Sequence, residues 1–333
     1  MKYSIPWNGT LINSPKPVKN SHGTSSPYYG ELYIYYIQGR AGHEKEMFGP
    51  DFIGNWEEDG FSFLFFSKPA HGIVDEFLIG RDDLILLDDY QMSYEEWHGD
   101  MPAPFSVGSL SIVPFHGEES GAPPSVALDN DDSHAPPMTS VLPDPVVKDA
   151  AFQGAGVSKP VYRVPIRIDP GVVFGVGNHP TTRDCMEALE LVFSRGPVET
   201  ALDIGTGSGI LSLGAAALGC GYTLSMDLNF LAAKTAENNV RINGMEKRVG
   251  VVCGSAFDFM TWPFELLIAN IHYDVMKSMM IPEVFCNKKY FILSGLLRSQ
   301  AEKIARRLEE MPVEIEKRWS ENGIWHTFFV TAK

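Results

Sequence analysis

The stretch TALDIGTGSGILSLGAAALGC, residues 200–220, combines three signals that together indicate one type of fold. Its first residues are typical of a buried strand, the glycines that follow favour a tight turn, and the apolar run after them predicts a helix. Within the turn, Asp203, Gly205, Gly207 and Gly209 form a D-x-G-x-G-x-G pattern. Glycines let a ligand approach the backbone, and a helix N-terminus offers unpaired N–H groups, so we expect this turn to cradle a cofactor.

The glycine pattern argues against one common cofactor class. The dinucleotide fingerprint G-x-G-x-x-G would require a glycine where Ile210 or Ser212 stands. Asp227, at the end of the next strand, can accept hydrogen bonds from both ribose hydroxyls of an adenosine, as in NAD enzymes and S-adenosylmethionine enzymes. The alternative for Asp227 is an N-terminal cap of the following helix. The glycine turn upstream favours the ligand-binding interpretation.

From about residue 162 onward, strand-like and helix-like segments alternate. This alternation predicts a doubly wound, mostly parallel sheet. Ligands of such sheets bind at the carboxyl ends of the strands. The seven expected strands are residues 200–206, 223–229, 249–255, 266–271, 290–296, 313–319 and 325–332.

The chain before residue 162 is organised differently. Four strand-like segments and one short helix candidate predict a small α+β domain. A segment rich in Pro, Ser, Asp and Gly follows, with little to bury, and is interpreted as a linker or insertion. The expected strands are residues 31–39, 61–68, 83–92 and 107–115, the helix is residues 71–80, and the domain boundaries are 1–115, 116–160 and 161–333.

Composition limits the class of protein. With 333 residues and 44% apolar content, the chain can bury two cores. No apolar run approaches the ~20 residues that span a bilayer, and the first residues lack the apolar core of a signal peptide, so we expect a cytoplasmic protein with no membrane contact. The cysteines form no C-x-x-C pair, which indicates neither a zinc site nor a disulfide framework. The expected reduced core thiols are Cys185, Cys220, Cys253 and Cys286.

The net charge of −15 is unevenly distributed. Residues 1–160 carry nine Lys/Arg against twenty-three Asp/Glu, a balance of −14, whereas residues 161–333 have a balance of −1. Direct nucleic-acid binding needs basic surface to neutralise phosphates, so the chain is a poor candidate for it. A basic protein partner suits the acidic first half better, with plain solubility as the alternative.

Polar side chains follow two further strands of the expected sheet. Asn270 ends LLIAN, where its side-chain oxygen can accept a hydrogen bond from an amine; the alternative is a strand-ending turn. His272 can take up a proton or cap the next helix, and we favour the cap. Ser255, after the third strand, can reach an adenine edge, although a capping or turn serine is the preferred interpretation.

A shaped loop, DPGVVFGVGNHPTT at residues 169–182, precedes the sheet. Its prolines remove backbone donors and its glycines permit conformations that other residues avoid, so it is not a regular element. Pro180 stands where helices begin, and Met186, Leu189 and Phe193 follow at spacings that predict an amphipathic helix. By itself the loop is compatible with an ordinary turn and helix cap.

In chain order, these blocks resemble the PrmA family, the bacterial methyltransferases of the stalk-base protein of the large ribosomal subunit. The resemblance covers about half of the chain, residues 168–330, and its most specific block is DPG-x-x-FG-x-G-x-HPTT. Residues 94–114 are more loosely similar to the family's connection between substrate-recognition and catalytic domains. The remaining blocks are LDIGTGSGILSLGAAALG, MDLN with AENNVRING, ANI, LSGLLRSQAE and Trp325.

The resemblance implies a fold, a reaction and a cofactor. The fold is α/β, a seven-stranded doubly wound (Rossmann-like) class I methyltransferase domain preceded by a small α+β domain. The reaction is N-methylation of protein amines, namely lysine or N-terminal amines of ribosomal protein L11, with S-adenosyl-L-methionine as cofactor and no metal. Methyl transfer to a neutral nitrogen depends mainly on positioning. Asn270 is therefore expected to orient the amine, with His272 as a candidate base.

The resemblance also implies which residues hold the cofactor, with the loop of residues 169–182 closing over it. Matched position by position, the family's cofactor residues fall on Thr182, Gly205, Asp227 and Asn270. The chain departs from the family pattern at Val176, where threonine is usual. The full expected set is Thr182, Asp203, Gly205, Gly207, Asp227, Asn270, Phe174 and Ser255.

Alternative functions remain compatible with the sequence. A nicotinamide-dependent oxidoreductase shares the sheet and Asp227 but would need G-x-G-x-x-G. A catalytically idle ribosome-associated protein would keep the fold without turnover, which the intact cofactor residues argue against. A methyltransferase of another protein or of a small-molecule amine is the third alternative. Cofactor binding separates the first two from the methyltransferases.

Overall fold

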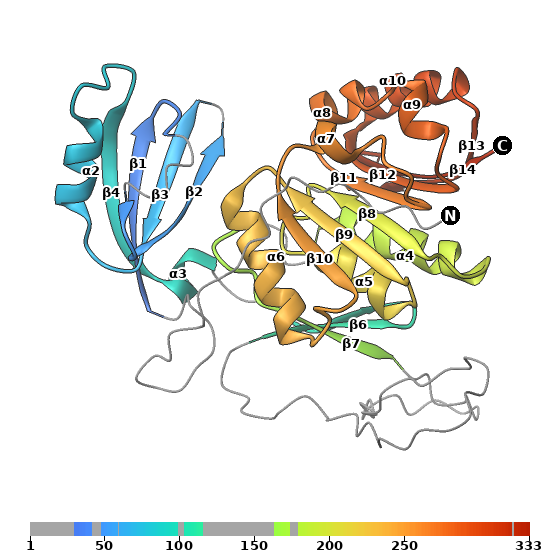
Figure 1. The fold of residues 1–333 in the computed structure, drawn as a ribbon, viewed down its shortest axis with the longest axis horizontal. Helices are drawn as coiled ribbons and strands as arrows, with labels where there is room; N and C mark the ends of the chain where they lie inside the picture. The colour runs from blue at the N-terminus through green and yellow to red at the C-terminus, as the bar shows by residue number, and fades with distance from the viewer. Residues whose placement is uncertain are drawn as a thin grey trace.

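Figure 1 shows the computed structural model of the chain, which describes residues 30–41, 48–58, 60–98, 103–115, 163–173, 179–321 and 323–333. Three sheets organise these residues. We call the four-stranded sheet with helices α2 (His71–Leu78) and α3 (Tyr94–His98) the small body, and the seven-stranded sheet with its helices the large body. No helix in the described ranges combines the length and apolar character needed to cross a membrane.

The seven-stranded sheet has the order β10-β9-β8-β11-β12-β14-β13. Its strands from β10 to β12 are parallel, whereas β14 lies antiparallel between β12 and β13. The antiparallel insertion distinguishes it from the order 3-2-1-4-5-6 of dinucleotide-binding folds. A mixed α/β fold around a large, mostly parallel sheet is thus confirmed. The strands are β8 (Thr200–Ile204), β9 (Tyr222–Asp227), β10 (Val249–Cys253), β11 (Leu266–Asn270), β12 (Tyr290–Leu297), β13 (Val313–Glu321) and β14 (Trp325–Ala332).

Helices cover both faces of this sheet, each over its own apolar cluster (Figure 1). One cluster joins α4, α5 and α6 to the sheet residues that point toward them, and the other joins α8, α9 and α10 to the opposite face. Met186 and Leu189 of α4 are fully buried, as the helical spacing predicts. The helices are α4 (Pro180–Ser194), α5 (Ile210–Ala217), α6 (Phe230–Ile242), α7 (Ala256–Phe259), α8 (Tyr273–Ser278), α9 (Pro282–Phe285) and α10 (Arg298–Glu309).

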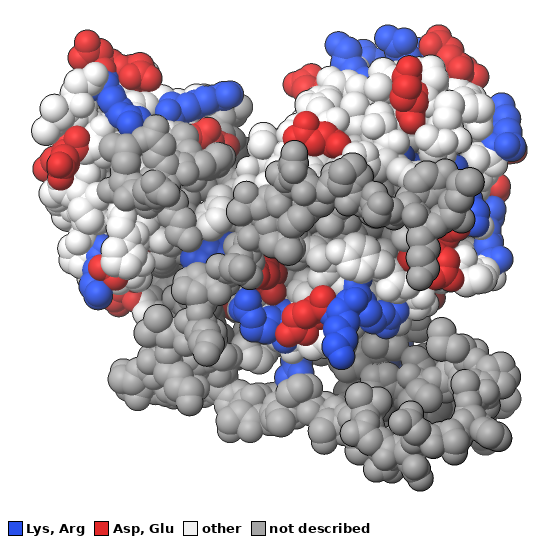
Figure 2. Space-filling view, viewed as in Figure 1, with Lys and Arg blue, Asp and Glu red and all other residues white. Residues whose placement is uncertain are grey.

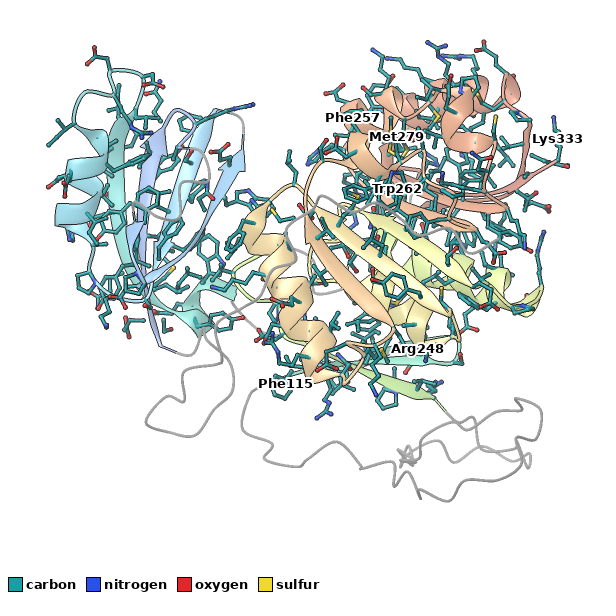
Figure 3. All side chains as sticks on the ribbon, in the orientation of Figure 1. Phe115, Arg248, Phe257, Trp262, Met279 and Lys333 are labelled. Carbon is teal, nitrogen blue, oxygen red and sulfur yellow. The ribbon has the colours of Figure 1, made fainter. Side chains whose placement is uncertain are left out.

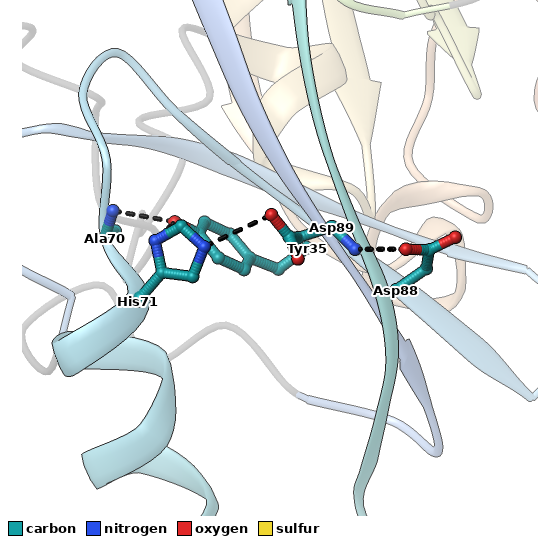
Figure 4. Close-up of polar contacts among 5 residues, drawn as sticks. All are labelled: Tyr35, Ala70, His71, Asp88 and Asp89. Atoms are coloured by element: carbon teal, nitrogen blue, oxygen red, sulfur yellow. Dashed lines mark hydrogen bonds and ion pairs between the residues drawn. The ribbon is translucent and has the colours of Figure 1, made fainter.

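The small body is an antiparallel sheet of order β2-β3-β1-β4 with α2 on one face. A polar chain anchors α2 (Figure 4): the buried Tyr35 hydroxyl accepts from the Ala70 backbone N–H (2.7 Å) and contacts His71, whose Nε2 lies 3.2 Å from Asp89. These contacts fix the start of the helix against β1 and β4. The elements are β1 (Glu31–Gln38), β2 (Phe52–Glu58), β3 (Phe61–Phe66), α2 (His71–Leu78) and β4 (Ile85–Ser93).

A three-stranded sheet, β5-β6-β7, lies against the helices of the large body. The strand expected at residues 107–115 is confirmed as β6, but its start is wrong, because Gly108 (φ 55°) turns the chain there and makes an antiparallel hairpin of β5 and β6. β6 pairs in parallel with β7, and Leu110 packs into the cluster of α4 and α5. The strands are β5 (Phe105–Val107), β6 (Leu110–Pro114) and β7 (Val164–Ile168).

Charged side chains of both signs are interspersed over both bodies on the face drawn in Figure 2. Several carboxylates of the acidic first half, such as Glu118 and Asp129, lie outside the described residues, as does the whole expected linker, residues 116–160. Cys185 and Cys220 are buried thiols as expected. The expectation of a core thiol is wrong for Cys286, which is exposed because it caps the short α9 at the surface.

The two bodies meet at Asp169, a carboxylate that is only 1% exposed. Its Oδ1 accepts from the Tyr94 hydroxyl (2.7 Å) of α3 (Tyr94–His98) and from the Gly171 backbone N–H (3.0 Å). Asn239 of α6 accepts from the Asp169 N–H and donates to both the Asp169 and Ser208 carbonyls, each at 2.8 Å. Hydrogen bonds of Asp169 and its neighbour Asn239 thereby connect four parts of the molecule: the start of the loop, α6, the glycine turn and the small body.

Replacing Tyr94 with phenylalanine should lower the free energy of unfolding by about 2 kcal/mol, because a hydrogen bond to a buried carboxylate is lost. Urea unfolding measures the change. Tyr90→Phe on the exposed strand β4 is the matched control and should change stability by less than about 0.5 kcal/mol. Equal effects of the two substitutions would contradict the role assigned to the Tyr94–Asp169 contact.

Candidate functional site

A cleft of about 550 Å³ opens at the carboxyl ends of β8, β9, β10 and β11, where the sequence predicts the ligand. One side is made by the large body and the other by the small body. The lining residues are Arg40, Trp56, Glu57, Gly60, Ile204, Gly205, Gly207, Met226, Asp227, Leu228, Asn229, Ala232, Gly254, Ser255, Ala256, Phe257, Asn270, Ile271, His272 and Val275.

The glycine turn between β8 and α5 lies along this cleft. Gly205, Gly207 and Gly209 have φ angles of 68°, 56° and 82°, a region that other residues rarely adopt. A Cβ at Gly205 would also lie 2.3 Å from Cγ2 of Ile271. Because Gly205 and Gly207 line the cleft, the turn presents bare backbone to whatever binds there.

Asp227 ends β9 and lines the same cleft. Its Oδ2 accepts from the Gly207 backbone N–H (3.0 Å) and its Oδ1 from the Asn229 backbone N–H (2.9 Å). Burial raises the pKa of Asp227 above its ordinary value, opposed by these hydrogen bonds. The alternative interpretation as a helix cap is wrong, since Asn229 caps α6 by accepting from Leu231 and Ala232. Each carboxylate oxygen keeps lone pairs for a ligand.

Asp203 is buried beneath the turn and is not among the residues that line the cleft. Its Oδ2 accepts from the hydroxyls of Thr206 (2.6 Å) and Ser212 (2.7 Å), and Ser225 in turn contacts Ser212. Burial raises the pKa of Asp203 to about 6. The structure therefore gives Asp203 a supporting contact to the turn in place of the direct cofactor contact expected from the sequence.

Asn270 ends β11 at the cleft, and its side-chain amide has no hydrogen-bond partner among the described residues. Gly295 of β12 leaves room for it: a Cβ there would lie 3.1 Å from the Asn270 Oδ1 and 2.7 Å from the Ile271 carbonyl oxygen. His272 is exposed and also lines the cleft. It occupies the N-cap position of α8 but makes no capping hydrogen bond, so the favoured interpretation as a side-chain cap is wrong.

Of the remaining residues expected to hold the cofactor, one lines the cleft, one is buried away from it and one lies outside the described residues. Ser255 lines the cleft and caps α7, its hydroxyl accepting from the Phe257 N–H (3.3 Å); the capping interpretation is confirmed and contact with adenine stays a prediction. Thr182 is buried in the first turn of α4 and is not among the lining residues. Phe174 and Val176 lie outside the described residues.

Sequence reasoning missed two apolar residues of the large body that border Asp227. Leu228 is 66% exposed and Phe257, labelled in Figure 3, is 51% exposed, and both line the cleft. Apolar side chains that border a cleft offer surface that a ligand can cover. The signal in the sequence is the apolar residue directly after a strand-ending aspartate in MDL.

The wall contributed by the small body was missed altogether. Arg40 follows β1, Trp56 and Glu57 belong to β2, and Gly60 lies in the turn between β2 and β3. No strand was expected at FIGNWEE, because Gly54 and Asn55 are poor strand formers. Nothing in this segment by itself signals proximity to a cleft more than a hundred residues away in the chain.

Comparison with known proteins relates the chain to one family. The family model described as ribosomal protein L11 methyltransferase (PrmA) matches residues 146–333. A ribosomal protein L11 methyltransferase of Desulforamulus reducens is 37% identical over 168 residues, which cover 50% of this chain and 54% of the relative. One of Bacillus cereus is 36% identical over 156 residues, 46% of this chain and 49% of the relative. The chain thus spans about half the length of the curated relatives it matches.

Among solved structures, a ribosomal protein L11 methylase from Lactobacillus delbrueckii subsp. bulgaricus is similar, with a TM-score of 0.47 and 29% identity. The similarity covers 55% of this chain and 91% of that one. A putative RNA methyltransferase from Pyrococcus horikoshii gives a TM-score of 0.41 at 17% identity over 46% of this chain and 84% of that one.

The geometry of Asp203 predicts a specific dependence of stability on pH. Its pKa is about 6 in the folded chain against an ordinary 3.8, so between pH 4 and 6 the folded chain holds a proton that the unfolded chain has released. Rising pH therefore removes up to about 3 kcal/mol of unfolding free energy through this group. Asp203→Asn is neutral throughout and lacks this loss.

Urea unfolding at pH 4 and pH 7 tests this expectation. The unfolding free energy of Asp203→Asn relative to the unmodified chain should rise by up to about 3 kcal/mol between the two pH values. The control is Asp258→Asn, which alters an exposed carboxylate on α7. A difference for Asp203→Asn that does not change with pH would show that its carboxyl titrates normally in the fold.

Proposed function

The chain belongs to the ribosomal protein L11 methyltransferase (PrmA) family, and from that membership we propose that it transfers methyl groups from S-adenosylmethionine to amines of ribosomal protein L11. The observation that carries the proposal is the pairing of Asp227 with the glycine turn, joined by the hydrogen bond from the Gly207 N–H. The remainder of the cleft is consistent with the same ligand.

The residues of the cleft fit an adenosine. Asp227 has acceptor capacity left on both oxygens, which suits the two ribose hydroxyls. Leu228 and Phe257 offer exposed apolar surface beside it, where a flat base can be covered, and Ser255 adds a hydroxyl at the edge. Gly205 and Gly207 leave the backbone accessible, and no metal-binding cluster of His, Cys, Asp or Glu occurs among the described residues.

When bound, S-adenosylmethionine supplies a methyl group on a positively charged sulfur. The chain's own task is to hold an amine in line with that group, which can contribute ~7–11 kcal/mol through orientation. The Asn270 side-chain oxygen, unpartnered among the described residues at the end of β11, would accept a hydrogen bond from the amine and direct its lone pair. A partly desolvated cleft lowers the pKa of an incoming ammonium and thereby favours the neutral form. His272, exposed at the rim, would accept the released proton or pass it to water.

The alternatives are less well supported. A nicotinamide-dependent oxidoreductase would need the third glycine of the fingerprint, where Ile210 and Ser212 stand in the first turn of α5. The strand order typical of dinucleotide-binding folds also lacks an antiparallel strand such as β14. An idle ribosome-associated protein would not need the Asn270 amide directed into the cleft. A different protein amine or a small-molecule amine suits the same cleft equally well, and identification of the methylated product separates these from L11.

Asp227→Asn should lower the affinity for S-adenosylmethionine about tenfold at pH 7.5, because hydrogen bonds to a charged acceptor are weakened. The raised pKa adds a pH dependence: as the pH is lowered, Asp227 becomes protonated and the affinity of the unmodified chain should fall, at a higher pH than an aspartate of ordinary pKa would give. The variant, which retains Asp203, should lose this part of the dependence. Titration calorimetry measures both, with Asp258→Asn as control. Identical affinity curves for all three proteins would exclude contact between Asp227 and the cofactor.

Labelled S-adenosylmethionine, incubated with the chain and total ribosomal components, should transfer label to ribosomal protein L11 on lysine or N-terminal amines. Asn270→Ala should reduce kcat about a hundredfold while leaving cofactor affinity within about threefold, because the group acts on the amine. Mass spectrometry of the products identifies the modified atom. Label found only in RNA, or on protein oxygen atoms, would rule out the proposed amine substrate.

A further inference from the structure

One wall of the cleft has no part in the function proposed above. Arg40, Trp56, Glu57 and Gly60 come from the small body, across from the glycine turn. β2, which carries Trp56 and Glu57, is an outer strand of its sheet, so its free edge faces the large body and side chains from both of its faces can border the cleft. These residues lie more than a hundred positions before the glycine turn in the chain.

The position of this wall is fixed by contacts with the helix that follows Asp227. The Asn229 side chain donates to the Asn55 carbonyl (3.2 Å), and Lys234 donates to the Ile53 carbonyl (3.4 Å). Gly54 lets the two backbones approach closely, since a Cβ there would lie 2.8 Å from the Leu231 side chain. β2 is thus held against the first turns of α6.

The link from β2 to Asp227 is short. Asn229 is the residue that bonds β2, and its own backbone N–H donates to the Asp227 Oδ1 (2.9 Å). The carboxylate proposed to hold the ribose and the backbone of the small body therefore share one neighbour. Trp56 and Glu57 line the same cleft as Asp227.

The wall carries an aromatic ring and charges of both signs, which suit the charged groups of S-adenosylmethionine. An indole ring attracts both apolar surface and a nearby cation, and the cofactor carries a sulfonium and an ammonium. Glu57 adds a negative charge on the same side, and Arg40 a positive charge suited to the cofactor's carboxylate. The large body supplies Asp227 as its charged group in the cleft, with the exposed His272 at the rim.

We propose that the edge of β2 is part of the cofactor site, so that S-adenosylmethionine is bound between the two bodies with Trp56 and Glu57 as direct contacts. This inference rests on the proposed function, namely that the cleft binds that cofactor. It assigns the small body a second role besides any contact with a protein substrate.

Titration calorimetry on the full chain tests the inference with two probes, S-adenosylmethionine and S-adenosylhomocysteine. Trp56→Ala should weaken binding of both about five- to tenfold, since an aromatic contact is lost. Glu57→Gln should weaken S-adenosylmethionine about threefold and leave S-adenosylhomocysteine unchanged, because only the former carries the sulfonium charge. A purely structural role of Glu57 would not discriminate between the probes.

Tyr90→Ala is the matched control: it removes an exposed aromatic ring of the same sheet that is not among the cleft residues, and binding should be unchanged. If Trp56→Ala fails to fold by circular dichroism, Trp56→Phe and Glu57→Gln decide, with Trp56→Phe expected to lose about threefold in affinity. Affinities equal to those of the unmodified chain in the folded Trp56 and Glu57 variants would overturn the inference. An unmodified chain that binds neither probe would instead overturn the proposed function itself.

Discussion

The buried carboxylate of Asp169 connects the small body, the loop after β7 and helix α6. Asp169 is removed from solvent, and its negative charge is stabilised by hydrogen-bond donors from three directions. Since an unsatisfied charge in this position would be costly, each donor is held in place. The donors belong to different parts of the molecule: Tyr94 to the small body, Gly171 to the loop, and Asn238 to helix α6. The geometry of the cleft follows from this arrangement, because α6 also carries the contacts to β2.

Two aspartates at the same end of neighbouring strands show how local environment separates their roles. Asp203 and Asp227 end or nearly end β8 and β9, and both are raised in pKa by burial. Asp203 points beneath the turn and is met by hydroxyl donors that suit either protonation state. Asp227 is met by backbone N–H groups, which favour the charged form and leave its oxygens facing the cleft. One supports the turn from below, and the other is available to a ligand.

The sequence predicts those features that local rules decide. A left-handed turn requires glycine, so the residue pattern alone is enough to locate Gly205, Gly207 and Gly209. Apolar spacing located α4, and the end of a strand located Asp227 and Asn270. Local rules did not predict β2, because Gly54 is a poor strand former that here pairs with β3 and leaves room for Leu231 of a distant helix. The spacing of residues in the glycine pattern also could not predict that the Asp203 side chain lies beneath the turn. That position depends on the hydrogen bonds that the Thr206 and Ser212 hydroxyls donate to it.

The position of β14 has a consequence for how the sheet is completed. This strand follows β13 in the chain, yet it lies between β12 and β13 and supplies all the pairing between them. During synthesis, therefore, β13 emerges with no neighbour to pair with, and β12 keeps one bare edge until the next segment is made. Such unpaired edges recruit other strands nonspecifically. The nascent large body passes through an interval of exposure to aggregation or to chaperone capture, which closes only when β14 inserts.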